Sequence, residues 1–249
     1  MPQAPSDPRP AQPVLVLCEL QRPSLPGLES YSPFCLKVHR ALKAAGLTYS
    51  SRHGNTPDAH RDVNPIGQVP VLLIDGRPVA DSTLILAALA ALQPTPAWAA
   101  VDPREHAEGL LWEEFADTTL GGFVVAARWA DERNWPLLRE TFFGAAPWPV
   151  RMLIAPAVRR RIVRGLVARD LWRAGHDACW SRFEIILDAL ERRAPASGFW
   201  LGDRLGVADL GLFAPLHSLR TPLTPWQHAQ VQARTNLRAY LDRIDEATR

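Results

Sequence analysis

Hydrophobic positions follow two different periods along the chain. Up to about residue 93, short apolar runs alternate with amphipathic segments, a pattern typical of strands that alternate with helices. The run VLVLC at 14–18 has no polar interruption and predicts a buried strand. Beyond about residue 103, apolar positions recur at the spacing of helices. The pattern therefore predicts an α/β domain followed by an all-α domain.

The best-defined helix of the first half is expected at 33–45. Its apolar residues share one face, Ser32 is a good N-cap, Pro33 suits the first helical position, and Gly46 suits the stop. Three short strands and a second helix complete the first half, at 47–52, 69–74, 77–80 and 81–92.

Amphipathic segments and prolines indicate the organisation of the rest. Helices are expected at 177–193 and 207–219, and one last helix is expected from about Trp226 onward. Three prolines between 94 and 103 indicate a linker. The expected divisions are a disordered tail at 1–13, a first domain at 14–93, a linker at 94–103 and an all-helical domain at 104–249.

Composition excludes several classes of function. The 249 residues are 47% hydrophobic, enough for a sizeable core, and the net charge of +2 gives no field that would attract nucleic acid. The longest uncharged stretch, 82–101, loses its apolar helical part near residue 92 and is too short to span a membrane. The three cysteines have no metal-ligand spacing, so we expect reduced thiols, no metal and a cytoplasmic location.

One short motif carries chemistry at the start of the first helix. Ser32-Pro33-Phe34-Cys35 has the spacing of a C-x-x-C redox motif, with the first sulfur replaced by oxygen. A helix N-terminus favours anions, and a thiol placed there can ionise at a pKa of roughly 3.5–7.5 instead of about 8.5. The Ser32 hydroxyl could donate a hydrogen bond to such a thiolate but cannot form a disulfide with Cys35. The alternatives remain open that Ser32 only caps the helix and that Cys35 is a small buried core residue.

The chain resembles the cytosolic glutathione transferases, which join a thioredoxin-like domain to a helical bundle. Three segments carry the resemblance: SPFCLKV at 32–38, NPIGQVPVLLIDGRPVADS at 64–82 and FWLGDRLGVADLGLF at 199–213. Within that superfamily the chain is similar to the serine type, and closest to the metaxin and failed-axon-connections-like branch with its bacterial relatives. Some members of that branch are thought not to catalyse a reaction.

The resemblance implies roles for seven residues around a bound glutathione. Ser32 would stabilise the glutathione thiolate, and Cys35 is the alternative as a nucleophile or mixed-disulfide partner. Val69 would pair through its backbone with the cysteinyl part, next to a cis Pro70, and Gln68 would reach the glycine end. Asp81 would bind the ammonium group and Ser82 the γ-glutamyl carboxylate, although Asp81 could simply cap its helix. The sequence leaves open whether Ser32 or Cys35 acts.

The resemblance therefore implies a glutathione transferase that acts on a small hydrophobic electrophile, with glutathione as cosubstrate and a homodimer as the assembly. Two alternatives stay open: a non-catalytic binding protein on the same fold, and a thiol reductase that uses Cys35. The aromatic residues expected on the wall of the acceptor site, or else in the core, are Trp112, Phe115, Phe123 and Trp129.

The segment 147–173 mixes apolar residues with arginines. Such a stretch can lie on a membrane surface or bind an anionic acceptor. We favour a third interpretation, a solvated helix that packs its apolar side on the bundle.

Overall fold

A mixed β-sheet lies at the centre of the first half of the computed structural model, which describes residues 12–93, 98–100 and 102–249. The strand order is β2-β1-β3-β4, with β1 parallel to β2 and antiparallel to β3, and with β3 antiparallel to β4. The strands span Leu15–Leu20 (β1), Ser50–Gly54 (β2), Val71–Ile74 (β3) and Arg77–Ala80 (β4). Leu17 and Cys18 are fully buried, because the uninterrupted apolar run of β1 occupies the middle of the sheet.

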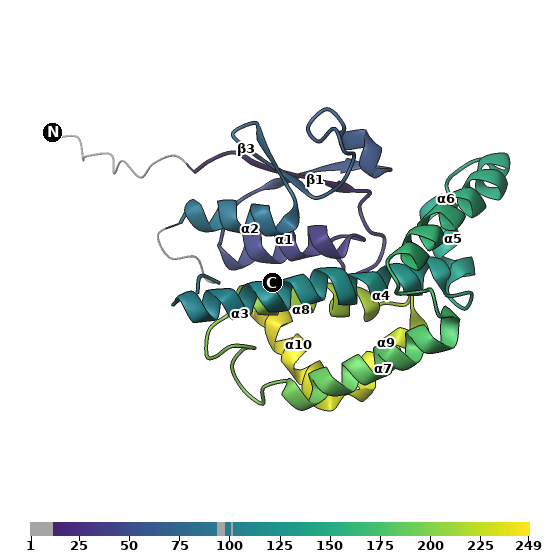
Figure 1. Ribbon diagram of the computed structural model, residues 1–249. Coiled ribbons are helices and arrows are strands. Elements are labelled where there is room, and N and C mark those ends of the chain that lie inside the picture. Colours follow the sequence, from purple (N-terminus) through teal and green to yellow (C-terminus); the bar gives the residue numbers. More distant parts are fainter. Residues whose placement is uncertain (1–11, 94–97, 101) are drawn as a thin grey trace.

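Two helices cover the face of this sheet that points toward the second half of the chain (Figure 1). They are α1 (Pro33–Ala44) and α2 (Ser82–Ala91). Both begin after a residue whose side chain accepts backbone N–H groups of the first turn, Ser32 for α1 and Asp81 for α2. A short 3-10 turn at Pro57–His60 follows β2.

The rest of the chain is helical. Two π-helical turns, Ala116–Leu120 and Ala126–Ala130, flank α4. The α-helices are α3 (Pro103–Phe115), α4 (Gly121–Val125), α5 (Trp135–Phe143), α6 (Trp148–Ala168), α7 (Gly175–Arg193), α8 (Val207–Leu219), α9 (Pro225–Ala233) and α10 (Thr235–Ala247). Helix α8 packs against α1, α3 and α10 and is buried along most of its length, so it forms the centre of the bundle.

The start of α8 depends on one buried carboxylate. Asp209 Oδ2 accepts the N–H of Gly206 at 2.7 Å, while Asp209 Oδ1 accepts the N–H of Trp200 at 2.8 Å and the hydroxyl of Tyr240 at 2.6 Å. Burial raises the pKa of Asp209, and these hydrogen bonds oppose that rise. The helix therefore begins at Val207 although a glycine replaces the usual side-chain cap.

The fold class predicted from the sequence is confirmed: an α/β domain with helices on its sheet precedes an all-helical domain. One strand prediction is wrong in position. The strand expected at 47–52 is β2 at Ser50–Gly54, an edge strand with mostly exposed residues that no apolar run marks. Residues 1–11 of the predicted tail at 1–13, and residues 94–97 and 101 of the predicted linker at 94–103, lie outside the described residues.

The single last helix expected from Trp226 is wrong, because the chain breaks at Arg234 into α9 and α10. The reason lies in another helix. Glu191 of α7 accepts the N–H groups of Asn236 at 3.1 Å and Leu237 at 2.8 Å. A side chain distant in sequence thus caps α10, and a local pattern cannot show it.

Candidate functional site

The pairing register brings three loop segments to one edge of the sheet. Val71 at the start of β3 lies opposite Cys18 near the end of β1 and opposite Ala80 at the end of β4. The segment before β3 and the segments after β1 and β4 therefore meet at the same edge. The loop segments carry Gln68, Val69, Pro70, Asp81 and Ser82, and Glu19 is the last residue but one of β1.

Helix α1 points its N-terminus at this edge, because its first turn contacts the end of β1. The Cys35 sulfur lies beside the Glu19 carboxylate and the backbone of Leu20. Ser32 stands one residue before α1 and is 8% exposed. The structure thus brings all seven sequence-predicted site residues to one region, although only Gln68 and Asp81 have exposed side chains.

Ser32 is engaged as a helix cap and still has a proton to donate. Its Oγ accepts the N–H of Cys35 at 3.3 Å, and its own N–H donates to Ser30 Oγ at 3.4 Å. A hydroxyl has two lone pairs and one hydrogen, so accepting the Cys35 N–H leaves a hydrogen to donate, which without a ligand interacts with the Cys35 sulfur. Capping and donation to a thiolate are therefore compatible in this geometry.

Cys35 is placed poorly for nucleophilic chemistry. Its side chain is fully buried, and burial raises the pKa of the Cys35 thiol to about 12, with the nearby Glu19 charge acting in the same direction. A hydrogen bond with Ser32 opposes the rise without cancelling it. At neutral pH this thiol stays protonated, which disfavours a role that needs its thiolate.

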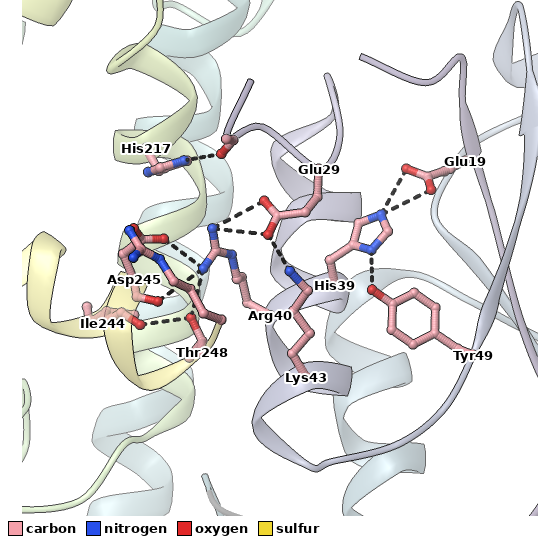
Figure 2. Close-up of polar contacts among 12 residues, drawn as sticks. Glu19, Glu29, His39, Arg40, Lys43, Tyr49, His217, Ile244, Asp245 and Thr248 are labelled. Carbon is pink, nitrogen blue, oxygen red and sulfur yellow. Dashed lines mark hydrogen bonds and ion pairs between the residues drawn. The ribbon is translucent and has the colours of Figure 1, made fainter. Parts of the chain in front are cut away.

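A buried polar network lies beneath the start of α1 (Figure 2). The Glu19 carboxylate contacts His39 Nε2 at 3.0 and 3.1 Å, and His39 Nδ1 contacts the Tyr49 hydroxyl at 2.7 Å. Burial would raise the pKa of Glu19, but hydrogen bonds from His39, Ser51 and Ser30 hold it below its ordinary value. Ser30 therefore contacts both Glu19 and the backbone of Ser32, so the network supports the predicted thiolate donor.

The sequence analysis missed this network. Glu19 ends an apolar strand and His39 lies between apolar residues of α1, and neither has a partner within a few residues in the sequence. An acidic residue at the end of a buried strand was the one local signal.

The loop before β3 is braced by one side chain. Asn64 Nδ2 donates to the carbonyl of Gln68 at 2.9 Å, and Asn64 Oδ1 accepts the N–H of Ile66 at 3.3 Å. The Val69–Pro70 peptide bond is cis, as the resemblance implied. Asn64 thus fixes the backbone next to Val69, while the Gln68 side chain remains exposed.

Asp81 caps α2, the role that the sequence analysis gave as the alternative to binding the ammonium group of glutathione. Its Oδ1 accepts the N–H groups of Thr83 at 2.9 Å and Leu84 at 3.3 Å. Ser82 beside it is buried. Between α2 and α3 lies a hollow of about 470 Å³, lined by Thr83, Ala107, Leu110, Leu111, Glu113 and Glu114. The hollow adjoins the Asp81–Ser82 end of the site and not Ser32.

One buried lysine lies behind the start of α2. Lys37 Nζ contacts Glu113 Oε1 and Asp117 Oδ2, both at 2.7 Å, and Thr83 Oγ1 donates to Glu113 Oε1 at 3.0 Å. Burial raises the pKa of Asp117 to about 6, opposed by Lys37 and reinforced by Glu113 and Asp81. Two carboxylates thus share one cation, which leaves an excess of negative charge next to Asp81.

The second domain holds the segment that leads into Ser32. Arg128 is buried and donates to the carbonyls of Tyr31 and Ser218. The Tyr31 hydroxyl contacts Ser24 Oγ at 3.1 Å, and its ring lies 4.9 Å from that of Phe142. Burial lowers the pKa of Arg128 to about 10, so it remains a cation at neutral pH. This arginine adds positive charge near the N-terminus of α1, and nothing in the local sequence marked it.

The four aromatic residues proposed for the acceptor wall pack into aromatic clusters. Phe123 lies 5.1 Å from Phe183 in the core, and Trp112 lies 5.0 Å from Trp200. Phe115 packs on Trp112 at 5.7 Å. Trp129 differs, because it lies 5.8 Å from Phe142, the residue that reaches Tyr31. Of the four, only Trp129 is connected by described ring contacts, through Phe142, to Tyr31 at the N-terminus of α1.

Within 12–93, 98–100 and 102–249, no three His, Cys, Asp or Glu side chains are grouped closely enough to hold a metal ion. The three cysteines are free and buried.

Family profiles match both halves of the chain. The profile described as glutathione S-transferase, N-terminal domain, matches residues 31–92, and the profile described as glutathione S-transferase, C-terminal domain, matches residues 170–243. A curated "Probable glutathione S-transferase" from Nicotiana tabacum is 31% identical over 98 residues. That match covers 38% of this chain and 44% of the relative, so it spans less than half of the relative's length.

Solved structures share the fold at low sequence identity. β-Etherase LigF from Sphingobium sp. strain SYK-6 has a TM-score of 0.62 and 20% identity, over 93% of this chain and 95% of that chain. A glutathione S-transferase from Methylobacterium radiotolerans in complex with glutathione sulfonate has a TM-score of 0.59 and 19% identity, over 93% and 90%. A glutathione transferase family member from Pseudomonas fluorescens Pf-5, with two glutathione bound, has a TM-score of 0.60 and 14% identity, over 97% and 95%.

The two profiles together match more than half of the 249 residues, in the order of the two domains seen in the structure. The chain therefore belongs to the glutathione S-transferase superfamily.

Proposed function

We propose that the protein is a cytoplasmic glutathione transferase of the serine type, in which Ser32 stabilises the glutathione thiolate. The observation that carries the proposal is the Ser32 hydroxyl, which caps α1 and retains a hydrogen that it can donate to a thiolate at the edge where the three loop segments meet. The positive end of the α1 dipole and the Arg128 guanidinium favour an anion at this point.

Glutathione would lie along the edge of the sheet. Its cysteinyl part pairs with the backbone of Val69 as an added strand, and Gln68 contacts its glycine end. Asp81 binds the ammonium group, which also offsets the excess negative charge around Asp117. Because the cap already uses the N–H groups of Thr83 and Leu84, the γ-glutamyl carboxylate depends on the hydroxyl and N–H of Ser82.

The reaction is a substitution or addition at an electrophilic carbon. The thiol proton passes to solvent, and the thiolate attacks the carbon to form a C–S bond. Any leaving group departs with its electron pair. Lowering the thiol pKa raises the thiolate fraction, and the shared site holds both reactants together. Trp129 and Phe142, next to Tyr31, provide an apolar wall suited to a small hydrophobic electrophile.

A homodimer is part of this proposal. Three leucines of α2 and α3 are exposed, Leu84, Leu110 and Leu111, and the last two line the 470 Å³ hollow. An exposed apolar patch of this kind is typical of a protein interface.

The test measures glutathione binding by titration calorimetry and turnover with an activated aryl halide. Wild type should bind, and bound glutathione should show the ultraviolet band of a thiolate near neutral pH. Ser32→Ala should lose that band and at least about tenfold of kcat, while Ser32→Thr should keep part of both. Asp102→Ala is the matched control, because it removes the cap of α3 at a similar cost of about 1 kcal/mol without touching the site. Equal activity of wild type and Ser32→Ala would exclude the role given to Ser32.

A second candidate is a non-catalytic binding protein, as in the metaxin-like branch. One observation favours it: Ser32 is only 8% exposed, and Tyr31 beside it is packed under the second domain. Absence of both heat and thermal stabilisation at millimolar glutathione would support this candidate over the transferase.

A further inference from the structure

Helix α6 turns apolar side chains toward solvent. We expected the segment 147–173 to pack its apolar side on the bundle, and for the first two turns of α6 this is wrong. Ala155 and Leu166 are buried, while the larger residues at its N-terminal end are exposed: Trp148 by 66%, Met152 by 46%, Leu153 by 74% and Ile154 by 48%. Figure 1 shows α6 extending outward from the bundle beside α5.

The same helix has an uncompensated positive charge. The 29 residues from 141 to 169 contain six arginines and no acidic residue. Arg151 pairs with Glu140 and Arg159 with Glu132. In the part of the chain that the structure describes, the exposed Arg160, Arg161 and Arg164 form no ion pair with an acidic side chain.

One side of α6 carries an exposed apolar residue and two exposed arginines, and the other exposed apolar residues of its N-terminal end lie around the helix. Leu153, Arg160 and Arg164 are separated by seven and four residues, so they project from the same side of the helix. At a rise of 1.5 Å per residue, Trp148 to Ile154 spans about 9 Å and Arg164 lies about 24 Å from Trp148. Ile154 to Arg160 is a further rise of about 9 Å, so α6 can enter a bilayer end first, with its apolar N-terminal turns inserted and the arginines left at the level of the phosphates.

We propose that the N-terminal end of α6 binds the surface of an anionic lipid membrane, with Trp148, Met152, Leu153 and Ile154 inserted and the three unpaired arginines on lipid phosphates. The contact is peripheral, since none of the described helices is long and apolar enough to cross a membrane. The proposal is independent of glutathione binding, because α6 contributes none of the predicted site residues.

The chemistry of the face distinguishes a lipid surface from other occupants. A second copy of this chain on a two-fold axis would set the arginines of one α6 either against those of the other or against its apolar end, and neither contact neutralises their charge. A nucleic acid would neutralise the arginines and leave the exposed leucine, isoleucine and tryptophan in water. A bilayer interface covers both kinds of side chain at once.

The experiment is flotation of the full-length protein with phosphatidylcholine vesicles, with and without phosphatidylserine. Binding should require phosphatidylserine and should weaken as salt rises. The triple variant Arg160→Gln, Arg161→Gln and Arg164→Gln should lose at least about tenfold in partition, and Leu153→Glu should lose binding as well. Because all four side chains are exposed, circular dichroism and the thermal midpoint should not change.

Matched controls alter the same chemistry on another face. Ile185→Glu replaces an apolar side chain of α7 that is 67% exposed, and the triple variant Arg182→Gln, Arg192→Gln and Arg238→Gln removes equal charge from α7 and α10. Both should bind vesicles as wild type does. Equal loss in the controls, binding without phosphatidylserine, or no vesicle binding would each overturn the proposal. Vesicle-independent dimerisation abolished by Leu153→Glu, or binding to nucleic acid alone, would replace it.

Discussion

Helices α1 and α6 are both basic, yet they use their charges in opposite ways. In α1, Lys37 and Arg40 are 1% and 2% exposed and lie against carboxylates. In α6, Arg160 and Arg161 are in solvent, and Leu153 is exposed beside them. One helix buries its charges, and the other exposes its apolar side chains.

The difference lies in partners supplied from elsewhere in the chain. Lys37 meets Glu113 and Asp117, which are 76 and 80 residues away in sequence. Burying an ion without polar partners costs several kcal/mol, so an arginine that lacks them stays in water, whereas buried Arg128 has two carbonyl partners. The comparison teaches that the function of a basic helix depends on distant acidic residues, which the helix sequence itself does not contain.

The largest effect is expected from removing the buried cation of α1. Lys37→Met leaves two carboxylates without a positive charge and should lower the free energy of unfolding by about 3–5 kcal/mol at pH 7, measured by urea titration. Lys43→Met, on the same helix but partly exposed and paired with Glu29, should cost less than about 1 kcal/mol. Similar losses in the two variants would contradict the distinction between buried and exposed charge.

The next effect is the pH dependence that Asp117 contributes. Its pKa rises from 3.8 to about 6 on folding, because of burial, so the folded protein binds more protons than the unfolded chain between these values. The contribution of Asp117 to stability therefore falls as pH rises through this window, by up to about 3 kcal/mol. Asp117→Asn, which keeps the Lys37–Glu113 pair, should gain stability relative to wild type from pH 4 to pH 7.

Urea unfolding at several pH values measures the stability difference between Asp117→Asn and wild type. Asp58→Asn is the control, because Asp58 is an exposed carboxylate. A difference between Asp117→Asn and wild type that stays constant with pH would show that Asp117 ionises normally.

A smaller effect concerns the thiol that α1 encloses. Cys35→Ala should cost about 1–2 kcal/mol, as expected for a small buried truncation, and should leave transferase turnover unchanged. In the folded protein at pH 8, a thiol-specific reagent should label Cys35 far more slowly than a free thiol, because its pKa is about 12 and it is buried. Unfolding should expose all three cysteines to the reagent. Fast labelling of native Cys35, with loss of turnover, would favour the thiol reductase.

The smallest effect is expected from the arginines of α6. Replacing Arg160, Arg161 and Arg164 together by Gln should change the free energy of unfolding by less than about 0.5 kcal/mol, because they lack acidic partners. Arg40→Gln in α1 should cost more than that triple change, since Arg40 contacts Glu29 and Asp245. A triple variant that unfolds more easily than Arg40→Gln would show that the α6 arginines are structural.

The local sequence pattern was sufficient to predict an element where that element depends on its own residues. The buried run of β1, the cap and stop of α1, and the apolar α8 were all predicted close to their observed bounds. The meeting of the Val69–Pro70 and Asp81–Ser82 segments at one sheet edge follows from the short gap between the strands predicted at 69–74 and 77–80, which pair antiparallel.

Pattern was insufficient where a second segment decides the outcome. Glu191 of α7 caps α10, Arg128 holds Tyr31, and Glu19 meets His39, each across many residues of sequence. The outward face of α6 was missed for a related reason: apolar and basic residues are mixed around the helix, so its period does not define the side that packs.

The contacts of Arg40 have a consequence for biosynthesis. Its guanidinium reaches Asp245 and Thr248, which the ribosome adds 205 and 208 residues later (Figure 2). At about 5–20 residues per second, that delay is on the order of 10–40 s. During translation, the Arg40 side of α1 therefore remains without these partners for that interval. A chaperone that binds nascent chains could bind this side of the helix before the C-terminal helix is made.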